Sequence, residues 1–507
     1  MNYKEIFIVN NKLPTYVATF LLVLIVVRVY LYGWVTDDAF ITFRSVINFI
    51  NGDGLVYNIG ERVQSYTHPL WFLILSGFAF FDTNLYFLSI TLGLLFTTLM
   101  LLYLKKLFQV TSSVTALIVA FILLFNSDIF LQFSTSGLEN SLTNFLLVSI
   151  FYYFFVHYEN INRGKAFNIF IISIMIGLLL TNRLDQLFIM SPLIVYLFLK
   201  NYKFLLIGML PLVSWHVFSL IYYGFLFPNT KYAKIGARSL SENLESGFSY
   251  FLDSLQADFL FFGFLFFVLS VSIYKLIKSF SILENRQFIL LVTIGIVLHI
   301  IYVIMFAGGD FMRGRFFISI LIMSLVLFAF LNIKVKLIGL VILGIASFIS
   351  YNIGFHENFV YKTHGLENER NFYKSHLALN LNPYNNYTQH PWGLSGQTLN
   401  SQKQATIVGV NGQWGYWINK TKLIDLVGLT DAYIARTPVI DNKRTGHFKH
   451  KIPGEYFIIQ NNKNANIEWE NKKDEELYKN LNIVITGPIF SKERLNAQVY
   501  IWKNYGI

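Results

Sequence analysis

No cysteine occurs among the 507 residues, and charged side chains make up only 14% of them. Without cysteine the chain has no disulfides, no iron–sulfur clusters and no thiolate chemistry. Ordinary soluble domains carry roughly 25% charged residues, so this low charge, together with 54% hydrophobic residues, excludes a soluble globular protein.

The hydrophobic residues are gathered in long runs. Roughly a dozen runs of about 13 to 20 apolar residues are present, and about 20 residues of helix cross a hydrocarbon core about 30 Å thick. They predict a polytopic α-helical membrane protein. The net charge of +11 is expected in its cytoplasmic loops, so we expect no nucleic-acid partner.

The order of the runs predicts a topology with about eleven transmembrane helices. The first run, 16–32, follows Lys4 and Lys12 without a small-residue cleavage site, so we expect an uncleaved signal anchor with a cytoplasmic N-terminus. The next run, 69–81, is short for a span and is expected to form an interfacial or re-entrant helix. The span 85–104 then runs inward, and later spans are centred near residues 122, 149, 174, 193, 212, 266, 297, 324 and 343.

This topology separates two kinds of loop. The loops assigned to the cytoplasm collect basic residues, as the positive-inside rule requires. They are Lys105 and Lys106, Arg163 and Lys165, Lys200 and Lys203, Lys275, Lys278 and Arg286, and Lys334 and Lys336. The loops assigned to the outside carry polar, motif-like sequence at 34–67, 136–140, 183–185, 222–234 and 308–315. The functional site is therefore predicted on the outer face of the membrane.

The composition changes near residue 351. Residues 1–351 form the predicted transmembrane module with its outer loop 34–67, and residues 352–507 are polar and contain no further run of spanning length. We expect this second part to be a soluble extracytoplasmic α/β domain. Strands are predicted at 405–410, before the turn at Asn411-Gly412, and at 456–459 and 483–485, with a helix at 474–481.

The first candidate for chemistry is the Asp37-Asp38 pair at the start of the outer loop. On a helix, Asp37 and Arg44 are seven residues apart and share one face, so a carboxylate and a guanidinium can point at one site. A solvated juxtamembrane helix with an Asp cap is the alternative, and spacing alone leaves both open.

The outer loop continues as Asn51-Gly52-Asp53-Gly54 and ends as Ser65-Tyr66-Thr67-His68-Pro69-Leu70-Trp71. Residues 36–71 resemble the first outer loop of GT-C glycosyltransferases, and most closely that of the terminal arabinofuranosyltransferases of mycobacterial cell-wall assembly and their bacterial relatives. The resemblance recurs at Ser136-Gly137-Leu138-Glu139, Arg183-Leu184-Asp185, 222–234, 308–315, 424–431 and Gly446-His447. His68 stands where the family usually has Asn or a similar residue, and Leu184 stands where it commonly has Pro.

The resemblance implies a GT-C fold and an enzyme of the bacterial inner membrane. Such an enzyme moves a sugar, here arabinofuranose or another pentofuranose, from a polyprenyl-phosphate donor to an outward-facing glycan, lipopolysaccharide or protein acceptor. In the family the general base is an Asp of the first outer loop, which corresponds to Asp37 or Asp38. We prefer Asp37 because of its spacing to Arg44.

The lipid phosphate leaving group needs fixed cations on the outer face. The candidates for binding substrate are Arg44, His68, Glu139, Lys231, Lys234, Asp310, Arg313 and Arg315. The His, Asp and Glu residues show no compact metal-ligand spacing, so neither a catalytic metal nor another cofactor is predicted.

Each of these candidates has a structural alternative. Lys231 and Lys234 can be ordinary lysines of a helix face, and 308–315 can neutralise lipid headgroups. Glu139 can act only as the dipole partner of a helix N-terminus, and Arg183 and Asp185 are expected to pair with each other. For the whole protein, the alternatives are a lipid-linked glycan transporter or flippase, and a membrane scaffold without enzymatic activity.

Overall fold

The computed structural model describes residues 12–82, 84–278, 285–333, 335, 339, 366–373, 390–399, 405–418, 421–462, 465 and 467–505. The described chain is mostly helical. Its N-terminal part comprises α1 (Lys12–Leu31), α2 (Asp37–Ile50), α3 (Pro69–Ala79), α4 (Leu85–Thr111), α5 (Val114–Asn126), α6 (Asp128–Ser134), α7 (Asn140–Val156), α8 (Tyr158–Asn162), α9 (Ala166–Asn182), α10 (Leu187–Gly208), α11 (Leu210–Tyr222), α12 (Asn229–Lys234), α13 (Leu240–Ala257), α14 (Phe259–Lys278), α15 (Arg286–Ile301) and α16 (Ile318–Leu331).

Several of these helices are able to cross a membrane. Five are long and apolar enough by length and composition: Leu13–Leu31, Leu85–Thr111, Leu184–Gly208, Phe259–Lys278 and Arg286–Ala307. A sixth results if α5 and α6, which are bent by 74° at their junction, form one broken span. The expectation of a mostly helical protein with several helices that are able to span a membrane is confirmed, whereas the count of eleven is not. The span expected near residue 343 lies outside the described residues.

Helix α3 has 11 residues, so at 1.5 Å per residue it is about 16 Å long and too short to cross a hydrocarbon core. This length agrees with the interfacial or re-entrant helix expected at 69–81. Other apolar helices, including α7, α9 and α11, have between 10 and 17 residues.

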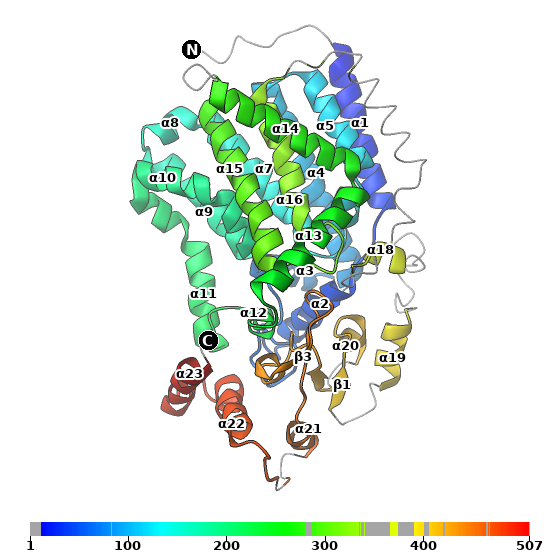
Figure 1. Cartoon of the computed structure of the whole chain (residues 1–507), viewed down its shortest axis with the longest axis vertical. Helices are drawn as coiled ribbons and strands as arrows, with labels where there is room; N and C mark the ends of the chain where they lie inside the picture. The colour runs from blue at the N-terminus through cyan, green and yellow to red at the C-terminus, as the bar shows by residue number, and fades with distance from the viewer. Residues whose placement is uncertain are drawn as a thin grey trace.

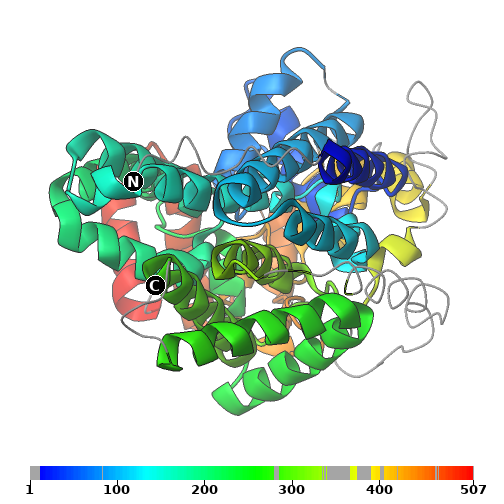
Figure 2. The ribbon, with the colours of Figure 1, turned by 90° about the horizontal axis from the view of Figure 1, so that it is seen from above.

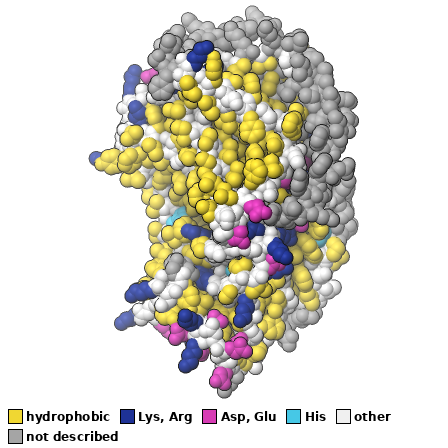
Figure 3. Space-filling model, viewed as in Figure 1, with side chains coloured by type: hydrophobic (Ala, Val, Ile, Leu, Met, Phe, Trp, Pro, Cys, Tyr) yellow, Lys and Arg dark blue, Asp and Glu magenta, His cyan; other side chains and the backbone are white. Residues whose placement is uncertain are grey.

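The helices form a bundle, and most of the C-terminal elements lie at one end of it (Figure 1). From above, α1 to α5 make one side, α8 to α11 a second and α13 to α15 a third (Figure 2). Hydrophobic side chains dominate the surface of the bundle, and charged side chains gather at the end where the C-terminal elements lie (Figure 3). At the centre, α16 is buried along its whole length among the other helices.

The C-terminal elements are small. They are α18 (Glu369–Phe372), α19 (Pro391–Leu399), β1 (Thr406–Val408), α20 (Gln413–Trp417), β2 (Leu423–Asp425), β3 (Val439–Asp441), β4 (Lys449–His450), α21 (Gly454–Asn461), α22 (Lys472–Thr486) and α23 (Lys492–Tyr505). Strands β1 and β2 pair in parallel, with Thr406 opposite Leu423, and β3 pairs with β4 antiparallel. The strand expected at 405–410 is therefore present as β1.

Two of the predicted strands are helices. The stretch 456–459 belongs to α21 and 483–485 belongs to α22, whereas the helix expected at 474–481 is confirmed within α22. The buried residues of α22 are Leu477, Leu481, Val484 and Ile485, whose spacing of three to four places them on one helical face. Val484 and Ile485 continue that face, so the stretch 483–485 does not start a strand.

The C-terminal elements are fixed to the polar end of the bundle by hydrogen bonds. Arg494 on α23 donates to the carbonyl oxygens of Ile221 and Tyr222, at 2.9 and 3.0 Å. A second contact is the segment 366–373, which runs across the bundle surface. The amide of Glu367 donates to the carbonyl of Phe311 at 2.9 Å, and Tyr373 stacks on the buried Trp34 with 6.2 Å between ring centroids.

Candidate functional site

The face shared by Asp37 and Arg44 on α2 meets α20. The Asp37 carboxylate accepts hydrogen bonds from the amides of Gly412 and Gln413, at 3.0 and 2.7 Å. Arg44 donates to the carbonyl of Gly415 at 2.7 Å, and its guanidinium lies over the ring of Tyr57. The shared face predicted from the spacing is confirmed, but it holds a segment of the protein itself.

Gly412 is required by this close approach. A Cβ at this position would lie 1.9 Å from the backbone oxygen of Asp37, so any larger residue would push α20 away from α2. Arg44 also donates to the carbonyl of Thr421 at 2.9 Å. Its hydrogen bonds to these carbonyls fix the C-terminal elements to the outer loop.

A cavity of about 370 Å³ lies at the polar end of the bundle. Its walls come from segments far apart in sequence, and each of the five predicted outer segments contributes to it. Most of the predicted site residues line it, namely Asp38, His68, Glu139, Lys231, Lys234, Asp310 and Arg315. Asp37, Arg44 and Arg313 do not.

Asp38 faces this cavity beside Arg315. Arg315 lies 3.9 Å from the Asp38 carboxylate through Nη1, and 2.6 Å from the Asp310 carboxylate through Nε. The Asp310 and Arg315 side chains are 2% and 14% exposed, and that of Asp38 is 25% exposed. Asp38 is therefore the accessible carboxylate of the Asp37-Asp38 pair.

A chain of ion pairs forms a second wall of the cavity. His68 lies 3.1 Å from Glu139, and Glu139 lies 3.1 Å from Arg183 through its other oxygen. Arg183 also forms the expected pair with Asp185, at 2.7 Å. All four side chains are largely buried, and the charges of Glu139, Arg183 and Asp185 compensate one another.

Not all of the predicted basic residues line the cavity. Arg313 makes two hydrogen bonds to Asp253, at 2.8 and 2.9 Å, outside the cavity. Lys231 and Lys234 belong to the short helix α12, and both line the cavity. The ammonium of Lys231 lies over the ring of Phe227, which is also part of the wall.

A smaller cavity of about 150 Å³ shares Asp38 with the first one. His447 and Phe311 also line both. The smaller cavity is rich in carboxylates and aromatic rings: Asp37, Asp38, Glu367 and Glu369, with Phe311, Phe372, Tyr373 and Trp392.

Glu369 and Trp392 were missed by the sequence analysis. They lie in a polar stretch without a recognisable motif, and Glu369 reaches the site because segment 366–373 packs on the bundle. The hydroxyl of Thr36 donates a hydrogen bond to the buried Glu369 carboxylate. His447 was noted only as part of a motif, and its Nδ1 atom has no hydrogen-bond partner among the described residues.

Burial raises the pKa of the carboxyls in this region. It raises the pKa of Asp37 to about 7, although the amides of Gln413 and Gly412 oppose the shift. It also raises the pKa of Asp38, while the nearby Arg315 guanidinium acts in the other direction. Burial and the neighbouring Asp38 raise the pKa of Glu369 well above its ordinary value.

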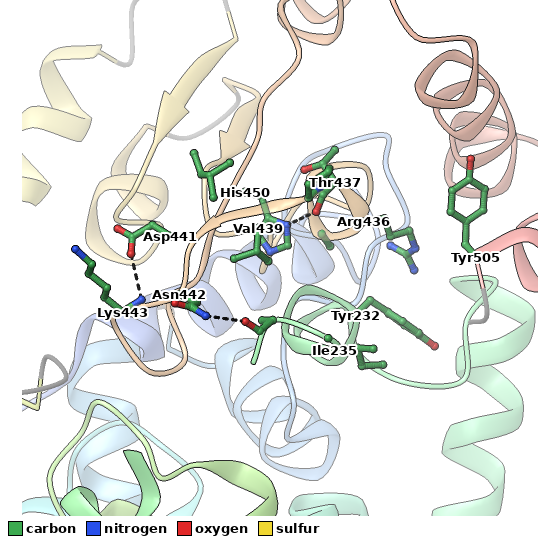
Figure 4. A pocket seen from close by; sticks show the side chains of 15 residues that line it. Tyr232, Ile235, Arg436, Thr437, Val439, Asp441, Asn442, Lys443, His450 and Tyr505 are labelled. Atoms are coloured by element: carbon green, nitrogen blue, oxygen red, sulfur yellow. Dashed lines mark hydrogen bonds between the residues drawn. The ribbon is translucent and has the colours of Figure 1, made fainter. Parts of the chain in front are cut away.

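Another cavity, of about 810 Å³, lies elsewhere (Figure 4). It is formed by the end of α12 and residues 435–443, with His450 and Tyr505. His450 is held between the carbonyls of Thr437 and Ala233, at 2.8 and 3.0 Å. None of the predicted site residues lines this cavity.

Within the described residues, no group of three or more His, Asp or Glu side chains is arranged to hold a metal ion. The arrangement around Asp38 instead combines an accessible carboxylate, a guanidinium and two ammonium groups next to apolar walls. A carboxylate of this kind can accept a proton, and the cations can stabilise a developing negative charge.

Comparison with known proteins gives one partial relationship. The terminal beta-(1->2)-arabinofuranosyltransferase of Corynebacterium glutamicum is 41% identical to this chain over 66 residues, 13% of this chain. The match covers 10% of the length of that relative. No family model and no solved structure matches the chain. Over this segment the chain is similar to a glycosyltransferase, and several of its helices are long and apolar enough to cross a membrane.

Proposed function

We propose that this protein is a membrane glycosyltransferase of the GT-C type. It transfers a pentofuranose such as arabinofuranose from a polyprenyl phosphate to a hydroxyl of an outward-facing acceptor. The observation that carries the proposal is the 370 Å³ cavity, in which Asp38 lies 3.9 Å from Arg315 and shares the walls with Lys231 and Lys234.

The cavity has the chemistry that a lipid phosphate requires. Its cations are suited to the phosphate, and rings such as Trp215, Phe227 and Phe316 supply apolar surface beside them. In the proposed reaction, an acceptor hydroxyl attacks the anomeric carbon and gives its proton to Asp38. The bond between the anomeric carbon and the phosphate oxygen breaks, and the phosphate leaves with the electron pair.

Asp38 is the better candidate for the base. Both carboxylate oxygens of Asp37 accept backbone hydrogen bonds, and Asp37 is buried. The spacing argument for Asp37 requires that Asp37 and Arg44 bind the same substrate. Arg44 instead donates hydrogen bonds to carbonyls of the C-terminal elements. The accessible side chain of Asp38 supports its role.

The direct test is a transfer assay with the full-length protein in nanodiscs. The donor is a polyprenyl-phosphate arabinofuranose with a labelled sugar, and the acceptor is an arabinofuranose oligosaccharide. We expect the label in a longer oligosaccharide and an equal amount of free polyprenyl phosphate. If proteoliposomes move the donor across the bilayer and no labelled product forms, the protein is a transporter and the proposal is wrong.

The outward orientation of the site has its own test, which the absence of cysteine simplifies. In intact cells, a cysteine in place of Lys443 should react with an impermeant maleimide, and a cysteine in place of Lys105 should react only after lysis. Labelling of position 105 in intact cells would show that the proposed topology is wrong. It would also place the site on the wrong face for an outward-facing acceptor.

A further inference from the structure

The two cavities that share Asp38 differ in their cations. The larger one is lined by four carboxylates and four cations, and two of these cations are Lys231 and Lys234 of α12. The smaller one contains four carboxylates, and its cation Arg444 is already paired with Glu367 at 3.1 Å. The larger cavity therefore offers a phosphate two lysine ammonium groups, and the smaller cavity offers none.

The smaller cavity also has an aromatic wall. The rings of Phe372 and Trp392 lie 5.3 Å apart, and the ring of Tyr373 lies 6.2 Å from that of Trp392. Phe372 is 54% exposed, although it is a large apolar side chain next to a cavity. Exposed aromatic surface beside hydrogen-bonding groups is typical of a place where a ligand with both apolar and polar faces binds.

A sugar ring has both kinds of face. Its C–H groups pack on aromatic rings, and its hydroxyls donate to carboxylate oxygens. The volume of about 150 Å³ is enough for one ring, since an apolar cavity of about that size binds benzene. A sugar acid finds no unpaired Lys or Arg in this cavity, because Arg444 is paired with Glu367, so a neutral sugar fits it better.

We propose that the smaller cavity, between segment 366–373, Trp392 and Asp38, is the subsite for a neutral saccharide. This assignment rests on the proposed function, in which that saccharide is the acceptor and Asp38 receives its proton. The lipid phosphate and the acceptor then reach Asp38 from different cavities. Trp392 and Phe372 determine which acceptor ring is held, and His447 contributes to the boundary between the two ligands.

Binding can be measured without a donor. The probes are a neutral arabinofuranose trisaccharide and an anionic galacturonic acid trisaccharide, titrated calorimetrically into the full-length protein in nanodiscs. We expect the neutral trisaccharide to bind at least about tenfold more tightly. Equal or tighter binding of the anionic trisaccharide would overturn the assignment to a neutral ligand.

The residues of the aromatic wall are tested by substitution. Trp392→Ala should weaken binding of the neutral trisaccharide roughly tenfold, and Trp392→Phe, which keeps a ring, should weaken it by less than about threefold. Trp502→Ala on α23 is the matched control, because Trp502 lines neither cavity, and it should change binding by less than about twofold.

A folding defect in Trp392→Ala is controlled by Phe372→Ala. Phe372 is exposed, so its removal should leave the melting temperature unchanged and still weaken binding roughly threefold or more. Unchanged trisaccharide binding in both alanine variants would overturn the subsite, even if transfer from the lipid donor is intact. Loss of binding in both variants of a protein that transfers no sugar would retain the subsite and reject the proposed function.

Discussion

Helix α12 separates two cavities that differ in size and in the state of their charges. The outer cavity measures about 810 Å³ and is lined by Tyr232, whereas the inner one measures about 370 Å³ and is lined by Lys231 and Lys234. In the outer cavity, Asp441 pairs with Lys449 at 3.3 Å, and both side chains are at least 35% exposed, so water weakens the pair.

The inner cavity holds one pair of opposite charges away from water. The Asp310 and Arg315 side chains are 2% and 14% exposed. Charges that are desolvated and opposed by specific partners are characteristic of functional sites, and volume alone is not. The cavity of about 370 Å³ is therefore the candidate active site.

The largest expected effect is at Asp38. Asp38→Asn should reduce transfer about 10²- to 10⁴-fold, because an amide cannot accept the proton of the attacking hydroxyl. The turnover number with saturating donor and acceptor is the measurement, and the melting temperature in nanodiscs shows that the variant is folded.

Asp37→Asn is the matched comparison. It keeps one acceptor oxygen for the amides of Gly412 and Gln413, so its main expected effect is a lower melting temperature. If Asp37→Asn removes transfer at normal stability and Asp38→Asn leaves it at the wild-type level, the base is Asp37.

The next largest effect distinguishes Arg315 from Arg313. Arg315→Lys should lower kcat/KM for the donor roughly ten- to a hundredfold, because an ammonium does not reproduce the planar fork of the guanidinium. Arg313→Lys should leave this ratio within about threefold and lower thermal stability instead, since Arg313 pairs with Asp253. Steady-state kinetics with varied donor concentration gives both ratios, and the reverse ranking would place the phosphate near Arg313.

Sequence reasoning predicted much of this site because its motifs follow directly from chain topology. The expected alternation of inward and outward loops places 34–67, 222–234 and 308–315 at one end, and the structure brings all three into one cavity. The face shared by Asp37 and Arg44 also follows from helical periodicity alone. Periodicity does not show which other segment packs on a helical face. The segment that packs on this face of α2 is α20, which lies more than 350 residues further along the chain.

The same limit explains the other differences. Glu369 enters the site through the packing of segment 366–373 on Phe311 and Trp34, which is a tertiary contact without a local signal. The stretch 483–485 has the composition of a strand, but the helical spacing from Leu477 onward determines its structure.

A smaller effect is expected in the pH dependence of transfer. The base must be ionised, so activity should fall as the pH falls through the pKa of Asp38. Burial raises that pKa above the ordinary Asp value of about 4, and Arg315 opposes the rise. Arg315→Met should therefore move the acidic limb of kcat to higher pH. An acidic limb that stays at the wild-type position would show that Arg315 does not affect the pKa of the base.

The smallest effect is expected in the outer cavity. Lys443 lines it, and the Lys443 side chain is exposed. Lys443→Ala should change kcat/KM for the donor and for the acceptor by less than about twofold, because a solvated lysine outside both Asp38 cavities contributes little. Steady-state kinetics with each substrate varied in turn measures both ratios. A tenfold loss of kcat/KM for the acceptor would show that the acceptor extends past α12 and that the outer cavity holds part of it. The two cavities would then be two subsites of one active site.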